Sequence, residues 1–312
     1  MIRDLLGFIL RAAVVLTGTA FVTFVLLWNA PGDPAQVIAM TRHDALLTEE
    51  VVALIREEAG LNAGFWAAFF SWVGPLVTLD FGRSVVSGQE VWPSLLSAVF
   101  YTFPLALAGL AIGTAISLPL AILATKKPGG LLDRITIAIA SLGAAIPTYW
   151  LGLLLILLFA VQMGWLPAMG ARTPMHAILP ALTLGLGVAA SLTRIIRSSI
   201  LEAKRQPFLP ALKRRGVSSK VVNRDHVAPH AAIPVVTLFG LELAFLLEGT
   251  VMVEVIFGRP GLGTLLVTAV ESRDFPLVQA VVILTALVFV TVNLVTDIVY
   301  RFIDPRIGEP NA

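Results

Sequence analysis

Apolar residues in this chain gather into long runs, and charged residues fall mostly between those runs. A helix needs about 20 apolar residues to cross the hydrocarbon core of a membrane. Six runs are close to that length or exceed it, and we therefore predict six membrane-spanning helices. The runs lie at residues 9–29, 98–124, 135–161, 177–196, 231–253 and 277–299.

Several of these runs contain proline, which would break a helix in a soluble protein. In a membrane bundle, neighbouring helices can satisfy the carbonyl groups that proline leaves free. The pattern therefore predicts an all-α integral membrane protein. The prolines concerned are Pro104, Pro119, Pro147, Pro180 and Pro234.

A seventh apolar stretch, residues 63–79, leaves the number of spans open. Cytoplasmic loops are enriched in Lys and Arg, but six spans with the N-terminus inside satisfy that rule as well as seven with it outside. The Gly74-Pro75 pair interrupts the stretch, and its Phe and Trp residues are typical of a segment at the membrane surface. We therefore favour a first span within residues 1–30, an extracytoplasmic segment at 31–97 and a core of five spans at 98–312.

Composition agrees with this fold class. The 312 residues are 57% hydrophobic and 13% charged, whereas soluble domains average about 25% charged. A net charge of +2 provides no general basic surface, so no nucleic-acid partner is expected. Because there is no cysteine, neither a disulfide nor a thiolate metal site is possible.

Cations gather in one loop, residues 198–230, between the fourth and fifth spans. Nine Lys and Arg residues lie from Arg194 to Arg224, at the end of the fourth span and in this loop, which predicts that the loop is cytoplasmic. Phe208, Leu209 and Leu212 have helical spacing and form a small apolar face, with Lys213, Arg214 and Arg215 in the last turn, where cations suit the helix dipole.

Two further residues predict where this short helix ends and the next begins. Gly216 occupies the position that favours a left-handed conformation after a helix, and Ser218 is a good N-cap for the helix that follows. The simplest hypothesis is that the cations only orient the loop. The helix-turn-helix pattern instead indicates a docking element for a cytoplasmic protein.

Blocks from end to end of the chain resemble the inner-membrane permease subunits of the dipeptide, oligopeptide and nickel family of bacterial ABC importers. The helix before Gly216 and the sequence after it resemble the cytoplasmic loop of such permeases. The blocks are "PGDP" (31–34), "LDFGRSV" (79–85), "IPTYWLGLLLI" (146–156), "GWLPAMG" (164–170), "ILPALTLG" (178–185), "GRPGLGTLLVTAVESRDFPLVQ" (258–279) and "IDPRI" (303–307).

The resemblance implies a multi-pass protein of the bacterial inner membrane, surrounded by lipid, that forms half of a translocation pathway. It implies a homologous second permease, two ABC ATPase subunits and an extracytoplasmic substrate-binding protein as partners. No cofactor is expected in this chain, because ATP and Mg would be bound by the ATPases. The implied ATPase-coupling loop contains Phe208, Leu209, Ala211, Leu212, Lys213, Arg214, Arg215 and Gly216.

The loop departs from the usual family pattern at three positions. The family has a three-residue motif that ends in two alanines. In this chain Pro210 stands at the first position of that motif, and Ala211-Leu212 stands in place of the two alanines. Pro207 stands where such permeases often carry an acidic residue. Because proline in a helix outside the membrane is comfortable only in the first turn, we expect the coupling helix to begin late, near residues 207–210.

The chain contains no G-x-x-x-x-G-K-[ST] sequence, and the "GRPGLG" stretch lacks the lysine that would reach a phosphate. We therefore expect no enzyme activity in this chain, and we expect "GRPGLG" to be an external turn. His226 and His230 are four residues apart, as two metal ligands on a helix would be. Pro229 between them and the basic surroundings favour solvated histidines instead. His43 and His176 are isolated and expected to be external.

Carboxylates inside predicted spans are costly, so they usually face a cavity or a polar partner. Glu242 and Glu248 are candidates for the transport pathway, with structural hydrogen bonds between helices as the alternative. Asp297 is a weaker candidate near the cytoplasmic end of its span, and Glu254 is expected at the external boundary.

The cargo stays open between short peptides, which are slightly favoured, and nickel or a metal chelate. A proton-coupled secondary transporter could use the same carboxylates. That alternative assigns no role to the loop helix or to Gly216.

Overall fold

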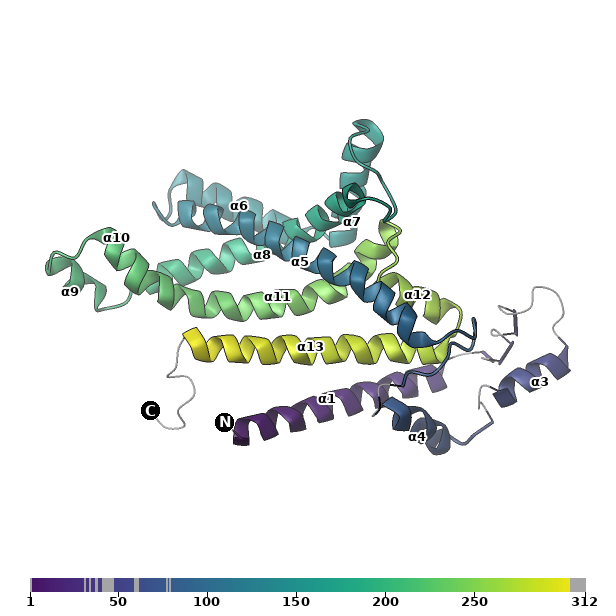
Figure 1. Cartoon of the computed structure of the whole chain (residues 1–312). Helices are drawn as coiled ribbons and strands as arrows, with labels where there is room; N and C mark the ends of the chain where they lie inside the picture. The colour runs from purple at the N-terminus through teal and green to yellow at the C-terminus, as the bar shows by residue number, and fades with distance from the viewer. Residues whose placement is uncertain are drawn as a thin grey trace. The chain divides into compact units, whose positions relative to one another are not determined.

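The computed structural model describes residues 2–30, 32–33, 35–36, 39–40, 48–58, 62–76, 78 and 80–303, without the side chains of residues 2–6, 213, 297 and 300–303. The described part is built from helices (Figure 1) and one isolated β-bridge between Arg83 and Glu90. The "IDPRI" block lies almost entirely outside the described residues, as do both prolines of "PGDP". The helices are α1 (Ile2–Trp28), α3 (Glu49–Glu58), α4 (Phe65–Leu76), α5 (Val91–Ala124), α6 (Leu131–Ala145), α7 (Thr148–Leu155), α8 (Ile178–Ala203), α9 (Leu209–Arg214), α10 (Ser219–Val222), α11 (Ala228–Ile256), α12 (Leu262–Glu271) and α13 (Phe275–Ile303).

Among the described residues, five helices are long and apolar enough to cross a membrane. They contain α1, α5, α8, α11 and α13, and they confirm five of the six predicted spans. The prolines inside α5 and α11 do not end those helices, which continue through Pro104, Pro119 and Pro234.

The predicted span at residues 135–161 is not one continuous helix. Here α6 and α7, which continues as a π-helix over Ile156–Gln162, are bent by 99° relative to each other. The break follows from Pro147, whose ring disfavours the helical conformation of the preceding residue. Ile146 accordingly has extended backbone angles, φ −81° and ψ 124°. The structure therefore has a sixth span only if this bent pair is counted as one.

The aromatic stretch within residues 63–79 forms α4, whose 12 residues give a length of about 18 Å. That is shorter than a membrane's hydrocarbon core. Its rings pack on the second half of α1, where Phe24 contacts Phe65 and Phe69 with ring centroids 5.2 and 5.3 Å apart. This packing accounts for the clustered aromatics, and the position of α4 at the membrane surface stays a prediction.

The chain divides into two compact units. Met1–Thr102 and Pro260–Thr291 form the first, and Phe103–Arg259 with Val292–Ala312 form the second. The core of the first unit joins the beginnings of α5 and α13 to α12. Its buried residues are Phe81, Val91, Leu95, Ala98, Leu262, Ala280 and Val281.

Two polar side chains fix the turns of the first unit. Thr102 Oγ1 accepts a hydrogen bond of 2.8 Å from the Leu262 amide, which caps the start of α12. Asp274 is 2% exposed and accepts hydrogen bonds from the Ser84 hydroxyl and the Val85 amide. These contacts join two of the sequence blocks, "LDFGRSV" and the long block after residue 258, which are about 190 residues apart in the chain.

In the second unit α8 is the central helix and packs against α6, α7 and α11. It crosses α5 closely because glycines face the contact. A Cβ atom added to Gly113 would lie 2.5 Å from Val188 Cγ1 and 3.0 Å from the Gly185 carbonyl oxygen. One added to Gly185 would lie 2.6 Å from Ile112 Cγ2. Small residues four apart on α5, Gly109 and Gly113, thus allow the backbones to approach, as is common in membrane bundles.

We predict that Gly113→Ala destabilises the protein by about 1–3 kcal/mol, because the extra methyl group overpacks the crossing of α5 and α8. The measurement is thermal denaturation of the detergent-solubilised protein, followed by size-exclusion chromatography. Gly187→Ala on α8 is the matched control, since a Cβ atom there meets nothing within 4 Å. Equal melting temperatures for the two variants would contradict a tight crossing.

Candidate functional site

The cationic loop has the helix-turn-helix form that its sequence predicts. After α8 ends at Ala203, α9 begins at Leu209, so Pro210 lies in its first turn as expected. Gly216 has φ +79°, which confirms the predicted left-handed conformation. Ser218 caps α10 by accepting a hydrogen bond from the Val221 amide at 3.4 Å.

The apolar residues of α9 are not all available to a partner. Leu209 is 4% exposed and Leu212 is partly buried, and both pack on the chain's own loop and helix ends. Phe208 is 37% exposed. The expected docking face of Phe208 with Leu212 is therefore incomplete in this chain, because Leu212 faces inward. The inner cluster, called here the loop core, consists of Ala203, Leu209, Val222, Val227 and Ala231 with Ile200, Leu212 and Val217 around it.

The surface that the loop presents is small and cationic. Ala211, Arg214, Arg215 and Gly216 are exposed, whereas the side chain of Lys213 lies outside the described residues. Arg215 ends α9 with backbone hydrogen bonds of 3.1 Å to the carbonyl oxygens of both Ala211 and Leu212. The site therefore offers guanidinium groups around a short, firmly seated helix.

The two loop histidines lie on one side of a continuous helix and contact Phe208. The centroid of the Phe208 ring is 6.0 Å from that of His226 and 5.5 Å from that of His230. His230 Nδ1 lies 2.9 Å from the carbonyl oxygen of His226, so this nitrogen carries the proton that it donates. Within the part of the chain that the structure describes, no group of three or more His, Asp or Glu residues could hold a metal ion.

A widened turn connects α10 to α11. Residues Asn223–Val227 are π-helical, and the Ala228 amide donates to the Asn223 carbonyl oxygen five residues earlier. The helix then runs without a break through α11 to Ile256. The loop and a membrane-spanning helix are thus one continuous rod, with one extra residue in the joining turn.

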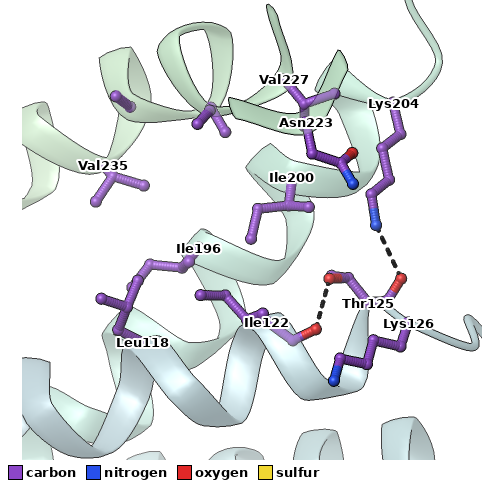
Figure 2. Close-up of a pocket in the computed structure, with 13 residues that line it drawn as sticks. Leu118, Ile122, Thr125, Lys126, Ile196, Ile200, Lys204, Asn223, Val227 and Val235 are labelled. Carbon is purple, nitrogen blue, oxygen red and sulfur yellow. Dashed lines mark hydrogen bonds between the residues drawn. The ribbon is translucent and has the colours of Figure 1, made fainter. Parts of the chain in front are cut away.

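Two polar contacts fasten the end of α8 to its neighbours. Lys204 Nζ donates a 3.0 Å hydrogen bond to the Thr125 carbonyl oxygen at the end of α5, as Figure 2 shows. Arg197 forms an ion pair with Asp133 of α6, with Nη2 2.7 Å from Oδ2, and Asp133 is only 3% exposed. Asp133 also accepts a hydrogen bond of 2.7 Å from the Gly129 amide. The pair spans 64 positions, so spacing along the chain gave no signal of it.

The candidate carboxylates on α11 differ in their burial and in their partners. Glu242 is partly buried and hydrogen-bonds with Ser191 of α8, which fits the structural alternative. Glu248 is exposed. Glu254 is fully buried at 0% exposure near the end of α11, and the sequence gave no indication of this burial. The side chain of Asp297 lies outside the described residues.

Glu248 stands within an apolar stripe along one face of α11. The exposed positions recur every three or four residues, which places them on the same side of the helix. This stripe consists of Leu241, Phe245, Glu248, Met252 and Val255.

Two family models cover nearly the whole chain. Residues 117–309 match the family described as binding-protein-dependent transport system inner membrane component. Residues 1–108 match the family described as the N-terminal part of such membrane components.

Individual relatives match over nearly their full length. The glutathione transport system permease protein GsiC of Escherichia coli strain K12 is 36% identical over 307 residues, which are 97% of this chain and 99% of that protein. The protein of the same name from Salmonella choleraesuis is 36% identical over 311 residues, 98% of each chain.

Solved structures share the fold at lower identity. The MetNI methionine ABC transporter in an inward-facing conformation aligns with a TM-score of 0.57 and 20% identity, covering 67% of this chain and 96% of that chain. An amino acid ABC transporter with histidines aligns with a TM-score of 0.55 and 19% identity, covering 67% and 94%. The all-helical membrane fold expected from the sequence is therefore confirmed.

Proposed function

Because this chain belongs to the family of binding-protein-dependent transport system inner membrane components, and is thus a permease subunit of an ABC importer in the bacterial inner membrane, we propose that it carries short peptides. The observation that carries this proposal is the 36% identity, over 97% of the chain, to permeases of glutathione transport. Glutathione is itself a tripeptide. Family membership also excludes the alternative of a proton-coupled secondary transporter, because importers of this class are driven by ATPases.

We expect four kinds of partner around this permease. A homologous second permease would supply the other half of the pathway, two ATPase subunits would bind the cytoplasmic loops, and an extracytoplasmic protein would deliver the peptide. The cationic surface at Arg214 and Arg215 supports an ATPase contact with acidic groups, since opposite charges steer association.

The coupling loop is suited to transmit movement because it is stiff. The loop core seats α9 on the end of α8 and the start of α11, and the Lys204 contact ties α8 to α5. A displacement of α9 by an ATPase therefore moves three membrane helices together, since packed interiors resist local deformation. The uninterrupted path from α10 through α11 extends this movement to Glu248.

The stripe on α11 supports a place for Glu248 in the pathway. A carboxylate exposed to lipid at mid-membrane costs several kcal/mol. The face that carries Glu248 is therefore expected to meet the second permease or an aqueous path, where it could hold the ammonium group of a peptide. Glu242 already has Ser191 as its partner, so we assign it the structural role.

The first test concerns the cargo. In cells that lack other peptide importers and express the complete system, we expect saturable uptake of labelled glutathione or dipeptides that depends on the binding protein. An ATPase variant without the phosphate-binding lysine is the control and should abolish uptake. Accumulation of labelled nickel or its chelate, without peptide uptake or competition by peptides, would replace the peptide proposal by the metal alternative.

The second test separates the two carboxylates. Glu248→Gln should lower peptide uptake about tenfold, equivalent to about 1.4 kcal/mol of lost interaction, while the complex still assembles. Glu242→Gln should leave uptake closer to normal, because glutamine can still hydrogen-bond with Ser191. The measurement is initial uptake rate normalised to co-purified complex. Normal uptake by the Glu248 variant would return this residue to a structural role.

The third test concerns coupling. Gly216→Val should strain the left-handed backbone by roughly 1–2 kcal/mol and misdirect α9. Membrane insertion should persist, because the spans and loop cations are unchanged. We expect ATPase co-purification and substrate-stimulated hydrolysis in reconstituted vesicles to fall together.

Two variants control for backbone strain in this third test. Gly129→Val introduces comparable strain at φ +77° in another turn, and it should retain the ATPases. Gly216→Asn should restore coupling, because asparagine tolerates the left-handed conformation. If Gly216→Val keeps both ATPase co-purification and substrate-stimulated hydrolysis at wild-type levels, the loop only orients the protein.

A further inference from the structure

A cavity of about 450 Å³ lies in the second unit, between the ends of α5 and α8 and the start of α11 (Figure 2). Its walls are mainly aliphatic. Six large side chains form most of the apolar lining: Leu118, Ile122, Ile196, Ile200, Val227 and Val235. Such a chamber suits a hydrocarbon chain, because its apolar lining packs against methylene groups without demanding hydrogen bonds.

Polar groups of the cavity gather at one side. Lys126 and Lys204 are exposed, and both line the cavity with Thr125 and Asn223. In Figure 2 these four residues lie together near the last turns of α5 and α8, away from Leu118 and Val235. The cavity is therefore amphipathic, with an apolar interior and two lysine residues on its polar side.

The residues that line the cavity exclude some classes of ligand. The lining, all of it within the described residues, carries no carboxylate for a peptide ammonium group and no aromatic ring for a nucleotide base. An anion attached to a hydrocarbon chain complements both parts. We propose that the cavity binds an anionic phospholipid of the cytoplasmic leaflet, with one acyl chain inside and its phosphate at Lys126 and Lys204. The choice of leaflet rests on the proposed function, which places the coupling loop in the cytoplasm.

The position of the cavity links this lipid to the coupling loop. Ile200, Val227 and Ala231 line the cavity and also belong to the loop core beneath α9. An acyl chain between α5, α8 and α11 therefore supports the residues that seat the coupling helix. Loss of the lipid would loosen that seat, and so the site makes coupling sensitive to the anionic lipid content of the membrane.

The test uses the purified complete importer in detergent, without ATP or peptide. A phosphatidylglycerol with a photoactivatable group in one acyl chain is added and crosslinked, and the labelled peptides are identified by mass spectrometry. We expect labelling within residues 118–126, 196–204 and 223–235. Unlabelled phosphatidylglycerol should compete, whereas phosphatidylcholine and inorganic phosphate should not.

Variants distinguish the two parts of the site. Lys126→Gln should reduce labelling about fivefold, because one cation near the headgroup is lost. The neighbouring Lys127→Gln is the matched control, since Lys127 does not line the cavity, and it should label normally. Ala232→Phe fills the apolar chamber and should abolish labelling of these segments in protein that still elutes as an intact complex.

Three outcomes would overturn the proposal. Equal labelling by phosphatidylcholine would show an unselective lipid contact, and displacement by inorganic phosphate would show a free-anion site. Unchanged labelling in Lys126→Gln and Ala232→Phe would show that the lipid binds elsewhere. The crosslinking assay does not measure transport, so its result can be interpreted even if the peptide proposal fails. Conversely, peptide uptake by a complex that binds no lipid at this cavity would support the peptide proposal alone.

Discussion

The hydrocarbon interior of a membrane offers no water to backbone amides and carbonyls, and this constraint shapes the whole molecule. Every such group must find its partner within the protein, which is why the membrane segments are helical. The same constraint limits how a helix can be interrupted. Where Pro147 breaks the third apolar run, the chain continues at once as α7, and Gly152 of α7 approaches Thr183 of α8 and the fully buried Phe257.

Apolar run length proved sufficient to predict five spanning helices, because it depends only on local sequence. The bend at Pro147 was missed although its signal was local. Pro104 and Pro119 lie inside a helix that continues, so proline alone does not identify a break. The sequence alone therefore does not separate these two prolines from Pro147. Gly109 and Gly113 did carry a usable signal, the four-residue spacing of small residues.

The cationic loop was likewise only partly predictable from the sequence. Its turn chemistry was predictable, because the left-handed conformation at Gly216 and the cap at Ser218 depend on adjacent residues. The inward direction of Leu212 was not, because a six-residue helix is oriented by the elements beneath it. Likewise Glu242 and Glu248 look alike in the sequence. They differ in the structure because Ser191 of another helix faces only one of them.

The widened turn at Asn223–Val227 sets the rotation of α10 relative to α11 within one continuous rod. Each residue in an α-helix advances the direction of its side chain by about 100°. Removing the extra residue of the turn would rotate α10, and the α9 that it carries, by about that angle relative to Glu248. The length of this turn therefore fixes the angular offset between α10 and the side chains of α11. Point substitutions leave that offset unchanged, whereas a single insertion or deletion resets it.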